Sequence, residues 1–339
     1  MKLIKTIDAV GHILCHDITQ IIKDVHKKPI FRKGHIVEEK DIPVLLSMGK
    51  ENLYIWEQKE GMVHEDEGAA VLRDLCLGEG MAFTEPKEGK IDILAAHDGL
   101  FKVDEDRLDR INDMEELMIA VRSGSTPVKK GDKLAGVRVI PLIIEEKKLA
   151  AAKEAAGNAP LLTLLPYRSL KAGIVTTGNE VFHKRIPDSF GPVVEAKLLE
   201  YGVEVMGQKI VGDEPQAIVG AIHDFLAMGA GMIVCTGGMS VDPDDRTPGA
   251  IRASGAQIVS YGAPVLPGAM FLLSYHQNGI PVLGLPGCVM YGKRTVFDLV
   301  LPRLVAGEKL TRRDLVRMGR SGLCLGCEPC HYPNCGFGR

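Results

Sequence analysis

The segment that decides the fold is residues 231–247, which read GMIVCTGGMSVDPDDRT. An apolar run leads into two adjacent glycines, and three aspartates follow within the four residues 242–245. The apolar run predicts a buried strand that ends at Gly237. Glycine lets a backbone approach a ligand closely, and the aspartates place negative charge beside it. The segment therefore predicts a ligand site at the end of a strand.

Similar patterns surround this segment between residues 171 and 310. Apolar runs that end in or near glycine predict further strands over 171–178, 203–211, 256–262 and 280–287. Apolar residues at helical spacing predict helices over 191–202, 213–229 and 289–307. Strands that alternate with helices form a mainly parallel sheet covered on both faces. We therefore predict an α/β fold for residues 171–310, a three-layer α/β/α sandwich.

The rest of the chain divides into three further parts. Residues 1–150 carry short strand patterns and turn signals, which predict a smaller β-rich domain of one or two lobes, with a helix over 62–81. Residues 151–170 continue from a strong helix former and predict a helical linker. Residues 311–339 form a cysteine-rich tail.

The overall composition of the 339 residues excludes several classes of protein. The net charge of −3 gives no sign of a nucleic-acid-binding surface. No apolar stretch reaches the ~18 residues that a membrane span needs, and the start of the chain lacks the pattern of a secretory signal. We therefore expect a cytoplasmic protein that binds neither nucleic acid nor membrane.

Glycines and hydroxyl residues gather where the predicted strands end. The carboxyl ends of parallel strands lie at one edge of the sheet, where ligands bind in such folds. A turn explains any one of these glycines equally well, but several at neighbouring strand ends favour a platform of N–H and hydroxyl donors for a phosphate or a flat ring. The platform consists of Thr176, Thr177, Gly178, Thr236, Gly237, Gly238, Ser240, Pro267, Gly268, Pro286 and Gly287.

Carboxylates lie beside this platform in the sequence. Asp242 and Asp245 follow the glycine pair, and Glu180 follows Gly178. On a solvated loop, aspartates alone would indicate only a turn. Beside donors that attract phosphate, however, carboxylates would repel the ligand unless a cation lay between them, and Mg²⁺ prefers such oxygen ligands. We predict a Mg²⁺ site formed by Glu180, Asp242 and Asp245.

The C-terminal tail has the cysteine spacing C-x2-C-x2-C-x4-C, at Cys324, Cys327, Cys330 and Cys335. In a reducing compartment such a cluster indicates metal binding before disulfides. Zn²⁺ with four thiolates, Zn²⁺ with His331 replacing one thiolate, and an Fe–S cluster all remain open. The alternative without a metal is an unstructured, oxidation-prone end. The scattered cysteines are predicted to pack rather than to react: Cys15, Cys76, Cys235 and Cys288.

Four motifs across roughly residues 171–305 resemble the molybdopterin-binding domain of molybdenum-cofactor biosynthesis: AGIVTTGNEV, IVCTGGMSVDPDDRT, VLPGAMF and PVLGLPGCVMY. Their order and spacing are similar to those of the molybdopterin molybdenumtransferases. The resemblance places Asp245 at the family's acidic position and Glu180 in a matched role. The chain departs from the family at Asn179, at Leu266, where a lysine is usual, and in lacking the family's N-terminal aspartate block.

The resemblance implies an enzyme that binds molybdopterin or its adenylylated form. It implies a Mg²⁺-assisted transfer of molybdate, or tungstate, with Asp245, Glu180 and Asp242 as catalytic residues. It also implies a homodimer, which would cover sheet edges of the N-terminal domain.

Two other interpretations remain open. The missing aspartate block favours a non-catalytic carrier or sensor of the cofactor that docks a molybdoenzyme or a cofactor-synthesis partner through the tail. A nucleotide-hydrolysing protein, as among the competence-damage proteins, is a third interpretation.

Overall fold

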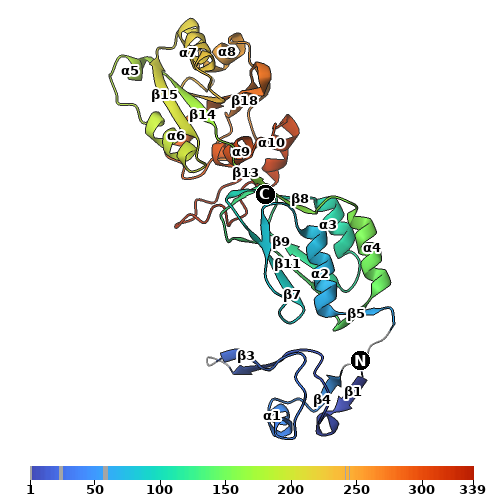
Figure 1. Cartoon of the computed structure of the whole chain (residues 1–339). Helices are drawn as coiled ribbons and strands as arrows, with labels where there is room; N and C mark the ends of the chain where they lie inside the picture. The colour runs from blue at the N-terminus through green and yellow to red at the C-terminus, as the bar shows by residue number, and fades with distance from the viewer. Residues whose placement is uncertain (1, 23–25, 56–59, 241, 244) are drawn as a thin grey trace. The chain divides into compact units, whose positions relative to one another are not determined.

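The computed structural model describes residues 2–22, 26–55, 60–240, 242–243 and 245–339 (Figure 1). The chain forms two compact units and passes between them more than once. Unit 1 comprises Met1–Leu94, Val103–Arg122 and Lys133–Thr163; unit 2 comprises Ala95–Lys102, Ser123–Asp132 and Leu164–Arg339.

A six-stranded sheet of order β15-β14-β16-β19-β18-β17 forms the centre of unit 2. Its strands are β14 (Lys171–Thr177), β15 (Glu204–Val211), β16 (Met232–Thr236), β17 (Gln257–Tyr261), β18 (Leu272–Tyr275) and β19 (Pro281–Leu285). Strand β14 runs parallel to β15 and β16, and β16 runs parallel to β19, whereas β18 is antiparallel to both of its neighbours. The predicted mainly parallel sheet is confirmed.

Helices cover both faces of this sheet (Figure 1). The helices are α5 (Asn179–Phe182), α6 (Phe190–Leu199), α7 (Pro215–Ala227), α8 (Thr247–Ala253), α9 (Val296–Val305) and α10 (Arg312–Met318). Apolar residues of α6, α9 and α10 form one buried cluster with one face of the sheet. Those of α7 and α8 form a second cluster with the other face. This is the predicted three-layer arrangement.

Helix α9 is shorter than the sequence pattern over 289–307 predicts, and this prediction is wrong at its start. Residues Gly287–Met290 form a short 3-10 helix instead, and α9 begins only at Val296. The side chains of Thr295 and Asp298 form a reciprocal capping box there, which satisfies N–H groups at the start of the helix. All ten residues of α9 are buried, including Pro302.

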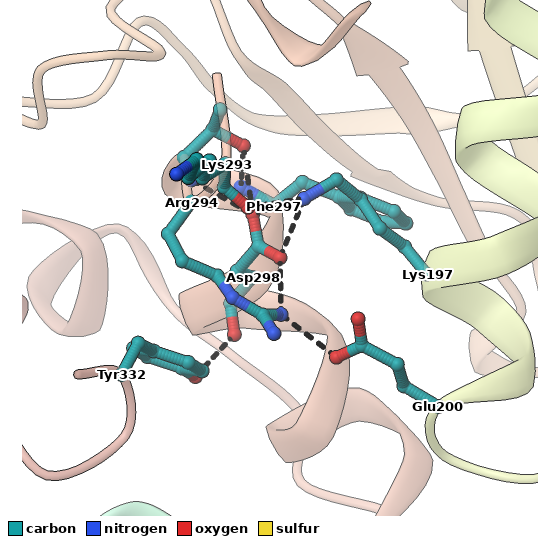
Figure 2. Close-up of polar contacts among 8 residues, drawn as sticks. Lys197, Glu200, Lys293, Arg294, Phe297, Asp298 and Tyr332 are labelled. Atoms are coloured by element: carbon teal, nitrogen blue, oxygen red, sulfur yellow. Dashed lines mark hydrogen bonds and ion pairs between the residues drawn. The ribbon is translucent and has the colours of Figure 1, made fainter. Parts of the chain in front are cut away.

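A buried ion-pair network joins α6 to the start of α9 (Figure 2). Asp298, which is 1% exposed, accepts hydrogen bonds from Lys197 Nζ at 2.7 and 2.8 Å and from Arg294 at 2.9 Å. Arg294 also pairs with Glu200 at 2.7 Å. Burial lowers the pKa of Arg294, but its pairing with Glu200 and Asp298 outweighs this and holds that pKa above its usual value.

Unit 1 contains the β-rich part of the chain together with three longer helices. Its largest sheet has the order β6-β7-β11-β9, from Met81–Phe83, Lys90–Ala95, Lys133–Val139 and Leu117–Val121. The longer helices are α2 (Glu65–Cys76), α3 (Glu105–Asn112) and α4 (Glu146–Ala156). The helix predicted over 62–81 is too long at both ends. Residues Met62–His64 form β5, which pairs with β12 (Ile143–Glu145), a distant segment that the local pattern does not reveal.

The described residues between 2 and 55 form small two-stranded sheets and a buried apolar cluster of their own. Strand β1 (Lys2–Lys5) pairs with β4 (Asn52–Ile55), and β2 (Ile18–Ile22) pairs with β3 (His26–Phe31). Helix α1 (Asp41–Ser47) supplies Leu45 to this core. A separate three-stranded sheet has the order β10-β8-β13, from Thr126–Val128, Gly99–Val103 and Leu162–Pro166. Within the described residues, no helix has the length and apolar character needed to cross a membrane.

Candidate functional site

The glycine-bearing loops of unit 2 lie at one edge of the six-stranded sheet. The strand register places Thr176 beside Thr236, and Thr236 beside Leu285. Leu272, at the start of antiparallel β18, lies opposite Gly284 near the end of β19. The loops that follow β14, β16 and β19 and the loop that precedes β18 therefore share this edge, as the sequence predicts.

The turn after β16 has no room for side chains. Gly237 and Gly238 both have positive φ angles, +83° and +55°. A Cβ atom on Gly237 would lie 2.2 Å from the backbone oxygen of Thr177, and one on Gly238 would lie 2.9 Å from Oγ1 of Thr247. The end of β16 thus packs directly against the end of β14, and only glycine fits both the space and the backbone conformation.

The threonines of the predicted platform are buried, and their hydroxyls bond to other side chains. The Thr236 hydroxyl donates to that of Thr176 at 3.2 Å, and Gln208 Nε2 donates to Thr176 Oγ1 at 2.7 Å. The Thr177 hydroxyl lies 3.1 Å from that of Thr247. These hydroxyls join β14 to β15, β16 and α8. The sequence analysis does not identify Gln208, and it expects these hydroxyls to donate to a ligand. Of the four hydroxyl residues in the predicted platform, Ser240 is the one that is exposed.

The acidic loop after the glycine pair is held by a residue that sequence reasoning also missed. Asp242 is exposed and Asp245 half-buried, and the carboxylate of Asp245 accepts the backbone N–H of Asp242 at 3.3 Å. The Tyr261 hydroxyl, from β17, donates to the carbonyl of Met239 at 2.8 Å. Burial and the nearby charge of Asp245 raise the pKa of Tyr261. Asp244 lies outside the described residues.

Glu180 is exposed and lies in the short helix α5, which directly follows β14 and Gly178. The backbone N–H of Asn179 beside it donates to the carboxylate of Asp213 at 3.0 Å, which ties this loop to the end of β15. Over the described part of the chain, no three His, Cys, Asp or Glu side chains meet in an arrangement that could hold one metal ion. The Mg²⁺ site of Glu180, Asp242 and Asp245 stays a prediction.

The two proline–glycine loops complete the edge. The carbonyl of Pro267 accepts the N–H of Val296 at 3.1 Å, and a Cβ atom on Gly268 would lie 2.5 Å from the Val296 side chain. These contacts place the loop before β18 against the start of α9. Pro286 is buried, whereas Gly287 is exposed at the end of β19.

The cysteine tail is bonded to this same edge. The N–H of Leu266 donates to the carbonyl of Gly322 at 2.7 Å, and the N–H of Cys324 donates to the carbonyl of Leu266 at 2.8 Å. Leu266 directly precedes Pro267 of the platform. The sequence analysis describes the tail as a separate part of the chain, but the structure places its first residues beside the loop that contains Pro267.

The remaining cysteines are mostly core residues. Cys15, Cys76 and Cys235 are fully buried, which confirms that they pack in the interior. Burial raises the pKa of Cys235 to about 12, so its thiol is protonated at neutral pH. Cys288 is half-buried.

Residues 173–306 match the family model described as "Probable molybdopterin binding domain". This segment is a domain of the molybdopterin-binding family. The molybdopterin-binding domain contains the whole glycine-rich edge and the acidic loop. Residues 3–57 match a second family model, whose description is a domain of unknown function.

Curated relatives match about a quarter of this chain. The CinA-like protein of Mycobacterium sp. (strain MCS) is 38% identical over 92 residues, which are 27% of this chain and 22% of that protein. The CinA-like protein of Mycobacterium avium (strain 104) is 40% identical over 79 residues, 23% of this chain and 18% of that protein. The chain thus spans about a fifth of the length of these curated relatives.

The solved structures that match part of the chain include that of the molybdopterin biosynthesis enzyme MoaB from Thermus thermophilus. It is 25% identical, with a TM-score of 0.37, and the match covers 41% of this chain and 98% of that one. The protein CinA from Thermoplasma acidophilum is 18% identical with a TM-score of 0.31, and the match covers 35% of this chain and 89% of that one.

Proposed function

We propose that the molybdopterin-binding domain of this chain binds molybdopterin, or its adenylylated form, at the glycine-rich edge. The observation that carries this proposal is the Gly237–Gly238 turn, where two strand ends meet without side chains between them. Glycines at a strand end allow a ligand to approach the backbone N–H groups closely, as at other strand-end anion sites. The family match over residues 173–306 supports the pterin as the ligand.

The activity that we propose is the transfer of molybdate, or tungstate, to the dithiolene of the bound pterin. Mg²⁺ prefers oxygen ligands, and the carboxylates of Glu180, Asp242 and Asp245 belong to the loops at this same edge. When bound, Mg²⁺ would supply positive charge against the adenylyl phosphate. The three carboxylates would hold the ion, and Tyr261 would keep the acidic loop in place through its bond to Met239.

Purification of the full chain from its own host tests this proposal. We expect a pterin to be released on denaturation, detected by its fluorescence after oxidation, together with molybdenum or tungsten. A bound nucleotide with no pterin would overturn the proposal and favour nucleotide hydrolysis. Pterin binding without turnover on added molybdate would favour the non-catalytic carrier.

Gly237→Val is expected to weaken pterin binding at least about tenfold and to lower the free energy of unfolding by about 1–3 kcal/mol. The added side chain would meet the backbone of Thr177 and would force a strained φ angle. Titration of the pterin, followed by its fluorescence, measures the first effect. Gly249→Ala in α8 is the matched control, because a Cβ atom there meets nothing within 4 Å. Equal affinity in the two variants would contradict a site at this turn.

We also infer a homodimer that forms through the first 55 residues. Large apolar side chains are exposed there, with Leu3 at 56%, Ile7 at 61% and Ile21 at 69% exposure. Leu3 and Ile21 lie on two different small sheets and Ile7 lies in a short 3-10 helix, and exposed apolar side chains of this size are typical of an interaction surface. Light scattering is expected to give twice the mass of one chain, and Ile21→Glu to shift it toward one chain. Met228→Glu, at an equally apolar exposed site in unit 2, should leave the dimer intact. A wild-type protein with the mass of one chain at all concentrations would refute the inference.

A further inference from the structure

We propose that the outer face of α10 and the first part of the C-terminal tail together dock an acidic peptide segment of a partner protein. This proposal does not depend on the ligand of the glycine-rich edge. The cysteine spacing predicts a metal in the tail, but over the described residues no three His, Cys, Asp or Glu side chains meet around one ion, so that site stays a prediction. The docking surface rests on the apolar and cationic side chains of this region.

The first part of the tail lines an apolar groove. Cys324 and Cys335 are half-buried in it and pack against the core of unit 2, and the buried Phe337 lines it as well. Leu323 and Leu325 also line the groove, yet they are 63% and 81% exposed. Large apolar side chains that are exposed together beside a groove are typical of an interaction surface.

Exposed arginines lead into this groove. Arg313, Val316 and Arg317 lie three and four positions apart in α10, which places them on one face of the helix. This face is exposed, and it lies opposite the residues of α10 that are buried in the core. Arg320 follows in the 3-10 helix Gly319–Ser321 and lines the groove. A stripe of positive charge therefore borders the apolar surface.

The three arginines of this stripe form no ion pair within the part of the chain that the structure describes. Residues 309–339 contain six Lys or Arg and two Asp or Glu, a net charge of +4, whereas the whole chain carries −3. Both acidic side chains of this segment are engaged with other residues: Asp314 pairs with Arg303 at 3.0 Å, and Glu328 pairs with Lys293 at 2.5 Å. The positive charge of the stripe is available to a partner.

Contacts with the domain hold the groove in shape. The hydroxyl of Tyr332, which lines the groove, donates to the carbonyl of Asp298 at 2.7 Å (Figure 2). Near the end of the chain, the N–H of Gly338 donates to the carbonyl of Ser321 at 2.7 Å, which closes the tail into a loop. A surface that is already ordered loses less conformational entropy when a partner binds.

The combination of a groove, exposed leucines and arginines favours an acidic peptide over other anionic partners. Nucleic acid is held mainly through its phosphates, and such contacts make no use of the leucines. A lipid surface takes up protruding apolar side chains and needs no groove. An acidic segment with a large apolar side chain would place its carboxylates against the arginines and that side chain against the leucines, which matches both features.

The test begins with a random library of peptides about 12 residues long, displayed on phage and selected on the full chain in a reducing buffer. We expect the enriched peptides to contain Leu, Phe or Trp and a share of Asp and Glu at least about double that of the unselected library. The most enriched peptide is then synthesised with a fluorescent label and titrated with the full chain. Raising the salt concentration from about 50 to about 300 mM should weaken its binding at least about threefold, because salt screens exposed charges.

Variants locate the peptide on the surface. Arg317→Glu and Arg320→Glu should each weaken its binding at least about tenfold, because each replaces an attraction by a repulsion. Leu325→Ser should weaken it at least about fivefold through the loss of an apolar contact. All three side chains are exposed, so the circular dichroism of these variants should match that of the wild type. Arg252→Glu and Leu199→Ser, at exposed sites of α8 and α6 that do not line the groove, are the matched controls and should keep the wild-type affinity.

Several results would overturn the proposal. They include a selection that enriches no peptide, enriched peptides without an excess of acidic residues, and equal affinity of the selected peptide for the wild type, Arg317→Glu and Leu325→Ser. Tighter binding of duplex DNA, or of vesicles that contain an anionic phospholipid, would assign the arginines to nucleic acid or to a membrane. Loss of the dimer in Leu325→Ser, measured by light scattering, would assign the groove to a second copy of this chain. None of these measurements involves the pterin, so failure here leaves the proposed ligand of the glycine-rich edge untouched.

Discussion

Asp298→Ala is expected to lower the free energy of unfolding by about 3–5 kcal/mol, because it leaves buried charges without a partner. Lys197 donates to both oxygens of this carboxylate, and its side chain is only 8% exposed. Arg294 would also lose one of its two carboxylate partners. The substitution further removes the capping box that starts α9. Urea unfolding, followed by circular dichroism, measures the loss.

Two control variants distinguish the contribution of the buried ion pair to stability from that of the helix cap. Thr311→Ala removes the same kind of capping box at the start of α10, where it should cost about 1 kcal/mol. Lys197→Met/Asp298→Leu removes both members of the ion pair and should be less harmful than Asp298→Ala, since fewer unpaired charges are left buried. If Asp298→Ala lowered the free energy of unfolding no more than Thr311→Ala does, the ion-pair network would contribute little to stability beyond the capping of α9.

Asp245→Ala is expected to reduce Mg²⁺-dependent molybdate transfer at least about 100-fold, since a Lewis-acid metal supplies several kcal/mol of stabilisation to the transition state. The free energy of unfolding should change by less than about 0.5 kcal/mol, because the carboxylate lies on a partly exposed loop and the hydrogen bond that it accepts from the N–H of Asp242 is long, at 3.3 Å. The assay uses adenylylated molybdopterin, molybdate and a range of Mg²⁺ concentrations.

The matched control for Asp245 is Asp224→Ala, an exposed aspartate on α7 that pairs with Lys209. It removes the same charge from the chain at a site away from the strand-end loops, so turnover should stay at the wild-type level. Wild-type turnover in Asp245→Ala would remove this carboxylate from the mechanism. Turnover recovered at high Mg²⁺ would support its role as a metal ligand.

The central sheet could be predicted because most of its strands have a strong local signal. Strands β14, β16 and β19 are mostly apolar runs followed within two residues by glycine, a pattern typical of buried parallel strands. The sequence analysis does not predict strand β18, because it has only four residues; its antiparallel partners β17 and β19 are the strands directly before and after it in the chain. The starts of α9 and α10 were overlooked, although the T-x-x-D capping pattern at Thr295 and Thr311 marks both.

The arrangement of the loops around the candidate site could be predicted for the same reason. Loops that follow parallel strands share an edge, so the position of Gly237 follows from the order of elements alone. The burial of each side chain depends on the register of the strands, which local sequence does not reveal: Thr176 and Thr236 are both buried, and Gln208 bonds to Thr176. The pair of Lys197 and Asp298 joins residues 101 positions apart, and no local pattern predicts it.

The complete burial of α9 has a consequence for how the C-terminus can be studied. Leu315, Met318 and Phe337 belong to the same apolar cluster as α9, so the segment that carries the cysteines also shields that helix from water. A protein truncated before residue 311 would expose an apolar surface and would be expected to aggregate. Its aggregation would not report on whether the cysteines bind a metal. Cys→Ser substitutions, which change one atom and leave these apolar contacts in place, test the role of the thiols without exposing the helix.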